Sequence, residues 1–463
     1  MTIWNPDIKK YSGSRYKALA DAIADDIKLG ILKPKQKLPT HRALAEHLGV
    51  TVGTITRGYA EAEKRGLIMA RMGSGTFVSG QKSDMADYLE SLKRDDEVID
   101  LSLSITLSHG QESILSEILT EISQDDPYLS FLVQYESEAG IPHQRKIIAD
   151  WLKSHEIEAN KDRMIICNGG QNAINTILSA LTSPDDRVLS ESLTYPGFTY
   201  LARQHQLKHY GVQMDQHGLI PEHLESLCQK LQPKLLYSIP TLQNPTTSTL
   251  SIKRRQQVIE IATRYDLLII EDQVQGILHS KPPIPLVTLN PEQVVYCGSF
   301  SKIFAGGLRV GYILTPKRLL NSLKSAFYLD CLFAPPLMTE IACRAIQSGR
   351  LAEMIKSKRI ELKKRQALVD SIFKGMEYYN HPDCLHTWLI LPEQWDPDEF
   401  VLQLQRNGVL VKSSKSFAVE HSVHAQGIRI CLTSPEKTED VEKGLRIIRD
   451  TLDRQPGVWQ SIM

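Results

Sequence analysis

Several apolar, β-branched runs in the chain are each followed at once by residues that can do chemistry. The run 294–296 leads into Gly-Ser-Phe-Ser-Lys, which ends at Lys302, and the run 267–270 leads into Glu-Asp, which ends at Asp272. Taken singly, each such residue has an ordinary explanation as a cap, a turn or an ion-pair partner. The candidates are Gly170, Gln171, Tyr195, Asn244, Asp272, Ser299, Ser301, Lys302, Arg309 and Arg429.

Together these residues match the requirements of one cofactor, pyridoxal 5'-phosphate. Such a site needs a lysine for the Schiff base and a carboxylate that keeps the pyridine nitrogen protonated, roles open to Lys302 and Asp272. Tyr195 would stack on the ring, and Asn244 would bind the ring hydroxyl. Arg429 would bind a substrate α-carboxylate with its planar fork. The N–H, hydroxyl and guanidinium groups of a phosphate cup would come from Gly170, Gln171, Ser299, Ser301 and Arg309,.

An α/β framework is needed to bring these residues together. From about residue 130 the chain alternates short β-branched runs with amphipathic stretches, which predicts a mainly parallel sheet covered by helices,. Ligands in such sheets bind beyond the carboxyl ends of the strands, which is where most of the candidates stand. The sequence has no G-x-G-x-x-G fingerprint, so a dinucleotide site is not indicated,.

The first 80 residues differ in charge from the rest. They hold 13 Lys and Arg against 7 Asp and Glu, a formal charge of +6, whereas the remaining residues hold 41 against 47, a charge of −6. A basic segment on an acidic body indicates a polyanionic partner, although charge alone leaves chance variation open. Apolar spacing predicts helices at about 19–27, 43–48 and 51–66 and strands at 67–71 and 76–78. This order is typical of a winged helix-turn-helix, whose third helix enters the major groove.

The stretch KLPTHRALAEHLGVTVGTITRGYAEAEKRGLIMARMGSGTFVSG resembles the DNA-binding domain of the GntR family of bacterial regulators. The LPTHRALAEHLGV segment and the RGLI and GSGTFV segments of the wing carry the resemblance. It implies double-stranded operator DNA as a partner, and Arg42 and Arg57 could neutralise phosphates or bind guanine. The positions where the family touches DNA are Arg42, Thr51, Thr54, Arg57 and Gly73.

From about residue 100 to the C-terminus the chain resembles an aminotransferase of fold type I, most specifically in SFSKIFAGGLRVG. A GntR domain joined to such a body resembles the MocR subfamily of transcription regulators. The resemblance implies pyridoxal phosphate binding and homodimers formed through the aminotransferase body. It also places Tyr135, in QYESEAG, near the family tyrosine that reaches the partner subunit's phosphate.

Three positions depart from the fold type I pattern. Gln275 stands where the family commonly has a tyrosine on the cofactor hydroxyl, three residues after the aspartate. Thr247 replaces a glycine common after Asn-Pro-Thr, and Gly306 replaces a frequent proline before Gly-Leu-Arg. Loss of the tyrosine should weaken control of the imine proton and therefore turnover. Cofactor binding should survive, because Lys302, Asp272 and the phosphate cup remain.

The leading hypothesis is therefore a cofactor-dependent, DNA-binding transcription regulator. An amino acid or amine effector would exchange with Lys302, form an external aldimine and shift the body between two arrangements. The alternative is an active aminotransferase with an accessory DNA-binding domain. A third interpretation keeps the regulator but makes the body a scaffold without cofactor.

The expected organisation is a DNA-binding domain over residues 1–80, a polar linker over 81–99 and an aminotransferase-like domain over 100–463. Within that domain, a large part is expected at about 130–330 and a small α+β part at about 331–463. No apolar run approaches the ~20 residues that span a bilayer, so no membrane association is expected. Seven scattered cysteines without a C-x-x-C pair fit a reducing cytoplasm and do not suggest a zinc knuckle,.

A pair of histidines, His205 and His209, stands four residues apart in a stretch that resembles a helix. Because residues four apart share one helix face, the two rings have the spacing of a metal-binding pair. No third ligand is evident in the sequence, so a structural role is favoured and no metal is expected.

Overall fold

The structure, a computed structural model, describes residues 4, 6–11, 14–33, 36–65, 67–71, 75–78, 98–108, 110–135, 137–419 and 426–454. The chain divides into two compact units, Met1–Asp95 and Asp96–Met463. Gly73, which was expected to contact DNA, lies outside the described residues, as do residues 81–97 of the expected linker.

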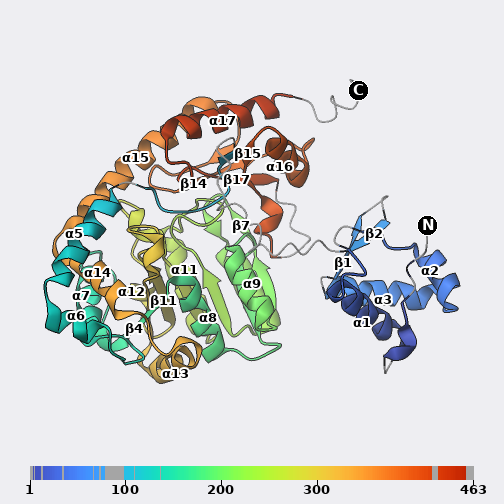
Figure 1. Ribbon diagram of the computed structural model, residues 1–463, viewed down its shortest axis with the longest axis horizontal. Helices are drawn as coiled ribbons and strands as arrows, with labels where there is room; N and C mark the ends of the chain where they lie inside the picture. Colours follow the sequence, from blue (N-terminus) through green and yellow to red (C-terminus); the bar gives the residue numbers. More distant parts are fainter. Residues whose placement is uncertain are drawn as a thin grey trace. The chain divides into compact units, whose positions relative to one another are not determined.

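In the part of the N-terminal unit that the structure describes, a short 3-10 helix and three α-helices are followed by a β-hairpin (Figure 1). The strands of the hairpin pair antiparallel, with Ile68 opposite Val78. This is the element order predicted for a winged helix-turn-helix. The elements are a 3-10 helix at Ile8–Lys10, α1 (Arg15–Lys28), α2 (His41–Leu48), α3 (Val52–Lys64), β1 (Ile68–Arg71) and β2 (Gly75–Val78).

Local sequence signals set the ends of α2 and α3. Thr40 and Thr51 cap the two helices, because their side-chain oxygens accept the main-chain N–H groups of Ala43 and Thr54,. Gly49 ends α2 in the left-handed conformation, with a φ of 63°,. The apolar stripes then meet in one core, whose members include Leu19, Ile23, Leu44, Ile55, Tyr59, Ala62, Ile68 and Val78.

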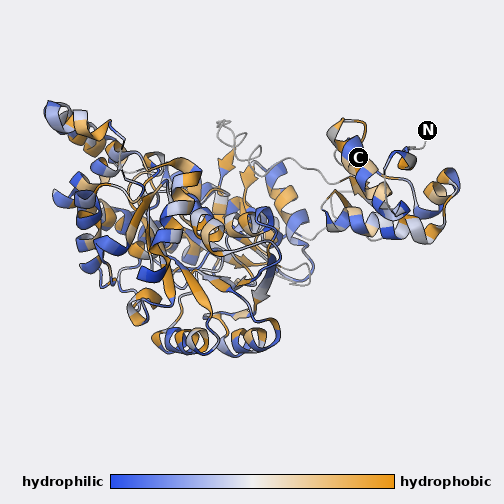
Figure 2. Ribbon diagram, turned by 90° about the horizontal axis from the view of Figure 1, so that it is seen from below, coloured by the Kyte–Doolittle hydropathy of each residue, from blue (hydrophilic) through white to orange (hydrophobic). Residues whose placement is uncertain are grey.

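A seven-stranded sheet is the centre of the C-terminal unit, with the strand order β4-β12-β11-β10-β9-β5-β6. Neighbouring strands run parallel except at β12, which is antiparallel to both β11 and β4. Figure 2 shows the strands mainly in orange, and β9, β11 and β12 are buried along their whole length, as expected for a sheet covered on both faces,. The strands are β4 (Met164–Cys167), β5 (Arg187–Glu191), β6 (Lys208–Val212), β9 (Leu235–Ser238), β10 (Leu268–Asp272), β11 (Val294–Ser299) and β12 (Gly311–Leu314).

Helices surround this sheet and share one apolar core with it (Figure 1). We call the sheet and these helices the large part. None of the described helices combines the length and the apolar character needed to cross a membrane. The helices are α5 (Gln111–Ser123), α6 (Asp126–Leu132), α7 (Pro142–Lys153), α8 (Gly170–Leu181), α9 (Pro196–Gln204), α10 (Pro221–Leu231), α11 (Ile252–Arg264), α12 (Leu286–Leu289), α13 (Leu320–Cys331) and α14 (Pro336–Gln347). A short hairpin is formed by β7 (Met214–Asp215) and β8 (Gly218–Leu219).

A smaller antiparallel sheet, with the order β13-β14-β17-β16, has its own core. We call this sheet and the elements packed on it the small part. Its elements are β13 (Tyr378–Tyr379), β14 (His386–Ile390), α16 (Pro397–Arg406), β15 (Val409–Leu410), β16 (Lys412–Ser413), β17 (Gly427–Cys431) and α17 (Thr438–Leu452). The long helix α15 (Arg350–Ile372) contributes Leu351 to the large core and Val369 to the small one.

The two cores do not divide at a single point near residue 331. The strand β3 (Ile99–Asp100) pairs in parallel with β15, and Leu101 is buried in the core of the small part. By contrast, α14 and the first turns of α15 pack in the core of the large part. The chain therefore enters the C-terminal unit through its small part. The sequence pattern does not predict this, because β3 has only two residues.

Candidate functional site

The strand registers bring several of the predicted site residues to one edge of the large sheet. Asp272 ends β10 and Ser299 ends β11, and Asp272 lies opposite Cys297 of the parallel neighbour. The antiparallel strand β12 places Gly311 beside both Ser299 and Cys167. The loops that leave β4, β9, β10 and β11 therefore start at the same edge.

Asp272 is 6% exposed, and its carboxylate accepts two hydrogen bonds. Oδ2 accepts from the hydroxyl of Tyr237 at 2.6 Å, and Oδ1 accepts from the main-chain N–H of Val274 at 3.0 Å. Burial raises the pKa of Asp272, while these bonds and the charge of Lys302 oppose the rise,. Sequence analysis missed Tyr237, although a tyrosine inside a buried strand signals that its hydroxyl needs a partner.

Glu271, the neighbouring acid, belongs to a different buried network. Its two oxygens accept the main-chain N–H groups of Leu286 and Val287 at 2.9 and 2.8 Å. The guanidinium of Arg255 lies 3.7 Å away, and both charged side chains are fully buried. Because successive side chains of a strand point to opposite faces, only Asp272 of the two acids can serve the cofactor edge.

Lys302 lies in the turn that follows β11. Its Nζ donates to the main-chain oxygen of Ser104, and its own carbonyl oxygen accepts from Oγ1 of Thr106 at 2.7 Å. Burial lowers the pKa of Lys302 to about 8. The neutral amine is the form that attacks an aldehyde, so this environment favours formation of a Schiff base.

A second buried lysine holds the same turn. Nζ of Lys358, on α15, donates to Oγ1 of Thr106 at 2.5 Å and to the carbonyl oxygen of Phe304 at 2.9 Å. Burial lowers the pKa of Lys358 to about 8. Lys358 thus links the Lys302 turn, at Phe304, to the segment that contains Thr106. No sequence motif marks Lys358.

The N-terminus of α8 and the loop after β11 come together as a cradle. Gly169 has a φ of 88°, and a Cβ at this position would lie 2.8 Å from Nη2 of Arg309, so only glycine fits,. Arg309 in turn donates from Nη2 to the carbonyl oxygen of Asn168 at 3.0 Å. A guanidinium is therefore held directly beside the first free N–H groups of α8.

Two hydroxyl groups complete this cradle. Oγ of Ser299 lies 2.9 Å from Oγ of Ser301 and accepts the main-chain N–H of Ser301 at 3.1 Å. A Cβ on Gly170 would lie only 3.9 Å from Cβ of Ser299, so the two loops are in close contact. Helix N–H groups, hydroxyls and a guanidinium in one place suit a phosphate dianion.

Tyr195 and Gln171 meet next to Gly197. A Cβ on Gly197 would lie 2.4 Å from the ring of Tyr195 and 2.5 Å from Oε1 of Gln171, which only glycine avoids. Nε2 of Gln171 donates to the carbonyl oxygen of Gly197 at 3.3 Å. Its Oε1 is buried and has no hydrogen-bond partner among the described residues. An orphaned amide end beside an aromatic ring is a feature that a bound polar ligand would satisfy.

Arg429 reaches from the small part to the large part. It lies on β17, and it donates from Nη1 to Oδ1 of Asn244 at 2.8 Å and from Nη2 to the carbonyl oxygen of Ser102 at 2.7 Å. The guanidinium carbon lies 4.9 Å from the centre of the Phe417 ring. Its Nε is buried with no hydrogen-bond partner in the described part of the chain. A buried guanidinium with an unused N–H suits a ligand carboxylate.

Two of the three departures from the family pattern have a clear structural form. Gln275 is 7% exposed, and its Nε2 donates to the main-chain oxygen of Leu242. Thr247 has a φ of 66°, the left-handed conformation in which glycine is the least strained residue,. That conformation explains why a glycine is common at this position.

Tyr135 lies at the surface with 84% of its area exposed, and its ring packs edge-on against Phe333 at 5.6 Å. Other exposed apolar side chains belong to the same two segments, and we call the whole group the apolar patch. Asp330, within one of these segments, accepts from Nδ2 of Asn172 on α8 at 2.8 Å, so the patch adjoins the cradle. The patch comprises Phe131, Val133, Tyr135, Tyr328, Leu329 and Leu332.

In the N-terminal unit the predicted DNA contacts fall into two groups. Thr51 and Thr54 form the cap of α3, with their hydroxyl oxygens 2.9 Å apart. Arg42 on α2 and Arg57 on α3 are exposed, and neither forms an ion pair with another described residue. The arginines are therefore available to a polyanion, whereas the threonines position the N-terminus of α3.

The histidine pair expected on one helix face does not lie on one helix. His205 follows α9, Gln206 adopts a φ of 57°, and His209 lies in β6. Nε2 of His209 lies 2.7 Å from Oγ of Ser190, and Nε2 of His205 lies 3.0 Å from Oδ1 of Asn175. The helix expectation was wrong because a left-handed residue ends the helix between the two rings.

Comparison with known proteins identifies both units. Residues 98–448 match the family described as aminotransferase class I and II, and residues 15–78 match the bacterial regulatory proteins of the gntR family. The chain is 32% identical over 450 residues to the uncharacterized HTH-type transcriptional regulator YdeF of Bacillus subtilis (strain 168), which covers 97% of both chains. The chain belongs to the class I and II aminotransferases and carries a GntR domain, as in the MocR subfamily.

This MocR-type chain also resembles free-standing aminotransferases. It is 26% identical over 380 residues to aromatic-amino-acid aminotransferase 1 of Thermococcus litoralis, which spans 77% of this chain and 90% of the relative. The crystal structure of an archaeal alanine:glyoxylate aminotransferase superposes with a TM-score of 0.73 at 26% identity and covers 80% of this chain and 94% of that one.

The residues of the MocR-type site fit pyridoxal 5'-phosphate, the cofactor of this class. The glycine-lined cradle, with the N–H groups at the start of α8, the hydroxyls of Ser299 and Ser301 and the guanidinium of Arg309, is the feature that a phosphate-bearing ligand would use. Lys302 would carry the cofactor, Asp272 would face its pyridine nitrogen, and the cradle would hold its phosphate. The bound cofactor supplies an electron sink for Cα of an amino compound.

Proposed function

We propose that this MocR-type chain is a DNA-binding transcription regulator whose C-terminal unit binds pyridoxal phosphate at Lys302 and senses an amino acid or amine there. The observation that carries the proposal is the contrast between two groups of residues. Asp272 and Lys302 stand in environments suited to binding the cofactor. Gln275, at the position of the family tyrosine, instead donates from its side-chain amide to the main-chain oxygen of Leu242. Binding groups are retained, and a group that would control a proton is not.

Lys302 is the residue at which an effector acts. Its amine donates to the main-chain oxygen of Ser104. This oxygen would accept a hydrogen bond from the Lys302 amine whenever that amine is not held by the cofactor. Arg429 would bind a carboxylate of the effector. Because Arg429 belongs to the small part and contacts Asn244 of the large part, that bond would change the contacts between the two parts,.

The N-terminal unit supplies the DNA contacts. We assign residues 1–80 to the DNA-binding domain, 81–99 to the linker and 100–463 to the effector-binding domain. Arg57 would meet DNA from α3 in the major groove, while Arg42 would meet the phosphates beside it. Thr51 and Thr54 would contact DNA at the N-terminus of α3, and Gly73 would do so from the wing.

The apolar patch supports a homodimer. Its side chains are exposed on α6, on the segment after it and around the end of α13, and contiguous apolar surface of this kind is typical of subunit interfaces,. Since the patch adjoins the cradle, a second copy seated on it would bring its own Tyr135 toward the phosphate position. A dimer also matches operators built from two half-sites.

DNA binding by the cofactor-loaded protein tests the proposal. Fluorescence anisotropy with the upstream region of its own gene and with a random duplex should show preference for the former and a steep loss of affinity with salt. Titration with a panel of amino acids and amines should then change both the visible spectrum and the affinity for the operator. Equal binding of specific and random duplex would refute the regulator.

An aminotransferase is the second candidate, favoured by one observation. The lowered pKa of Lys302, to about 8, supplies a neutral amine that could move a proton at Cα,. Steady turnover of an amino acid with 2-oxoglutarate, abolished in Lys302→Ala, would support it. Spectral exchange without turnover would support the regulator alone.

A further inference from the structure

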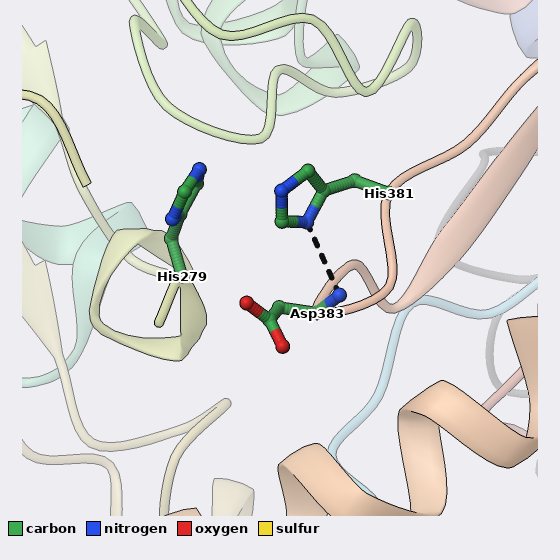
Figure 3. Close-up of side chains that lie close together, drawn as sticks. All are labelled: His279, His381 and Asp383. Atoms are coloured by element: carbon green, nitrogen blue, oxygen red, sulfur yellow. Dashed lines mark hydrogen bonds between the residues drawn. The ribbon is translucent and has the colours of Figure 1, made fainter. Parts of the chain in front are cut away.

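A cluster of two histidines and one aspartate, outside the cofactor site, has the composition of a metal site (Figure 3). One ring nitrogen each of His279 and His381 and one carboxylate oxygen of Asp383 all lie within 4.8 Å of one another. The cluster spans the junction of the two parts. His279 follows the 3-10 helix Gly276–Leu278 of the large part, and the other two residues lie between β13 and β14 of the small part.

The carboxylate of Asp383 is the observation that points to a ligand. Asp383 has no exposed surface, and Figure 3 shows one of its two carboxylate oxygens on the side of the two rings. Its Oδ2 accepts the main-chain N–H of Ser280 at 2.8 Å, whereas its Oδ1 is buried with no hydrogen-bond partner among the described residues. A buried carboxyl oxygen without a partner is unfavourable, and a bound cation removes that penalty.

The rings of His279 and His381 are close together. Their centres are 4.4 Å apart, with a tilt of 36°. Neutral imidazole is the form that ligates metal ions.

Arg359, which interacts electrostatically with Asp383, does not neutralise it through a hydrogen bond. Arg359 donates from Nε to the carbonyl oxygen of Leu278 and from Nη2 to that of Ile277, both at 2.8 Å. Its N–H groups are therefore used by the main chain that leads into His279. Oδ1 of Asp383 therefore receives no hydrogen bond from this arginine.

Each ring also has a main-chain contact that an ion must displace. The N–H groups of Lys281 and Asp383 lie 3.1 Å from Nδ1 of His279 and of His381, respectively. They direct the lone pair of each neutral ring to Nδ1 and its proton to Nε2. An ion either replaces the N–H contact at Nδ1, or binds Nε2 after the ring proton has moved to Nδ1. Both routes give up weak hydrogen bonds, so we expect weaker binding than at a fully preformed zinc site.

We propose that His279, His381 and Asp383 bind one divalent transition-metal ion, with Zn²⁺ as the best match. Two imidazoles, one carboxylate and a water make a four-coordinate set typical of zinc, whereas Mg²⁺ and Ca²⁺ prefer oxygen ligands. Zinc bonds of about 2.0–2.2 Å put neighbouring donors roughly 3.4 Å apart. The cluster therefore contracts on binding, and the ion clasps the small part to the large part.

Cobalt(II) titration of the untagged, cofactor-loaded full chain tests this site, because Co²⁺ has visible bands that report its ligands. The protein is first stripped of metal and freed of unbound cofactor. We expect one Co²⁺ per chain, with intense tetrahedral bands of nitrogen and oxygen ligation, displaced by one equivalent of Zn²⁺. No saturable Co²⁺ binding, or bands of thiolate ligation, would overturn the site.

Four variants locate the ion. His279→Gln, His381→Gln and Asp383→Asn should each weaken binding at least tenfold, while His217→Gln, which changes an exposed histidine elsewhere, should bind as the parent does. Unchanged binding in His279→Gln or His381→Gln would overturn the site. The Co²⁺ spectrum of the wild-type protein tests the metal site even where a variant fails to fold. This result does not depend on DNA binding, so it is separate from the proposed function.

Discussion

Nη1 of Arg429 donates a hydrogen bond of 2.8 Å to Oδ1 of Asn244. This bond joins β17 of the small part to the loop after β9 of the large part. The residue expected to bind an effector carboxylate is therefore in direct contact with the residue expected to bind the cofactor hydroxyl. A ligand that recruits the guanidinium competes with this bond, which couples ligand recognition to the junction.

Arg429→Gln should separate amino acids from amines. Loss of a hydrogen-bonded charge partner, about 1.5–3 kcal/mol, predicts roughly tenfold to hundredfold weaker binding of α-amino acids. Amines without a carboxylate should bind within about twofold of the parent, because they do not use the guanidinium. Spectral titration with alanine and with ethylamine measures the difference. Arg406→Gln, an exposed arginine on α16, is the control, and equal losses for both ligands would contradict the carboxylate role.

Tyr237→Phe should weaken cofactor binding. The Tyr237 hydroxyl stabilises the carboxylate of Asp272 and holds its pKa down, so its removal favours protonated Asp272, which cannot pair with a protonated pyridine nitrogen. A hydrogen bond to a charged group, about 1.5–3 kcal/mol, corresponds to a tenfold to hundredfold rise in the dissociation constant. Fluorescence titration of the stripped protein checks it, with Asp272→Asn as the stronger perturbation. Tyr265→Phe, whose hydroxyl contacts Gln229 at the surface, should have no effect.

The rate at which stripped protein captures pyridoxal phosphate should depend on the pKa of Lys302. Burial lowers this pKa from 10.5 to about 8, and only the neutral amine attacks the aldehyde,. The rate constant should therefore rise with pH up to about 8 and level off above it. Stopped-flow absorbance between pH 6 and pH 10 is the measurement, and borohydride trapping should label Lys302. A rise that continued through the highest pH would show that the amine is not desolvated.

Arg57→Ala should weaken operator binding and reduce its dependence on salt. An exposed arginine that neutralises one phosphate contributes about one unit to the slope of log affinity against log salt. Anisotropy measured over a series of potassium chloride concentrations gives that slope. Arg406→Ala should leave both quantities unchanged, since it lies on the C-terminal unit. Loss of affinity with an unchanged slope would assign Arg57 to a base contact in place of a phosphate.

Much of the fold was predictable because its signals are local. The apolar runs that end at Asp272 and before Lys302 are strands of a buried, mainly parallel sheet, and the carboxyl ends of such strands necessarily meet at one edge,. Thr40 and Thr51 cap α2 and α3, and Gly49 ends α2, which are positions where threonine and glycine are the favoured residue types,. These predictions needed only residue type and spacing.

The contacts that depend on distant segments were not predictable. Tyr237, Ser104 and Lys358 reach Asp272 or the Lys302 turn from other elements, and no spacing rule connects them. His205 and His209 had a helical spacing that a single left-handed residue, Gln206, cancels. His279 and Asp383 are likewise far apart in sequence, and only the packing of the small part on the large part brings them together.

The first described residues of the C-terminal unit have an unusual set of bonds. After β3, the oxygen of Ser102 accepts from Arg429, the oxygen of Ser104 accepts from the amine of Lys302, and Thr106 bonds to the carbonyl of Lys302. This short peptide is also the tether that continues into the DNA-binding domain. A ligand that engages the lysine amine or the arginine guanidinium would therefore act on the peptide segment by which the chain enters the C-terminal unit.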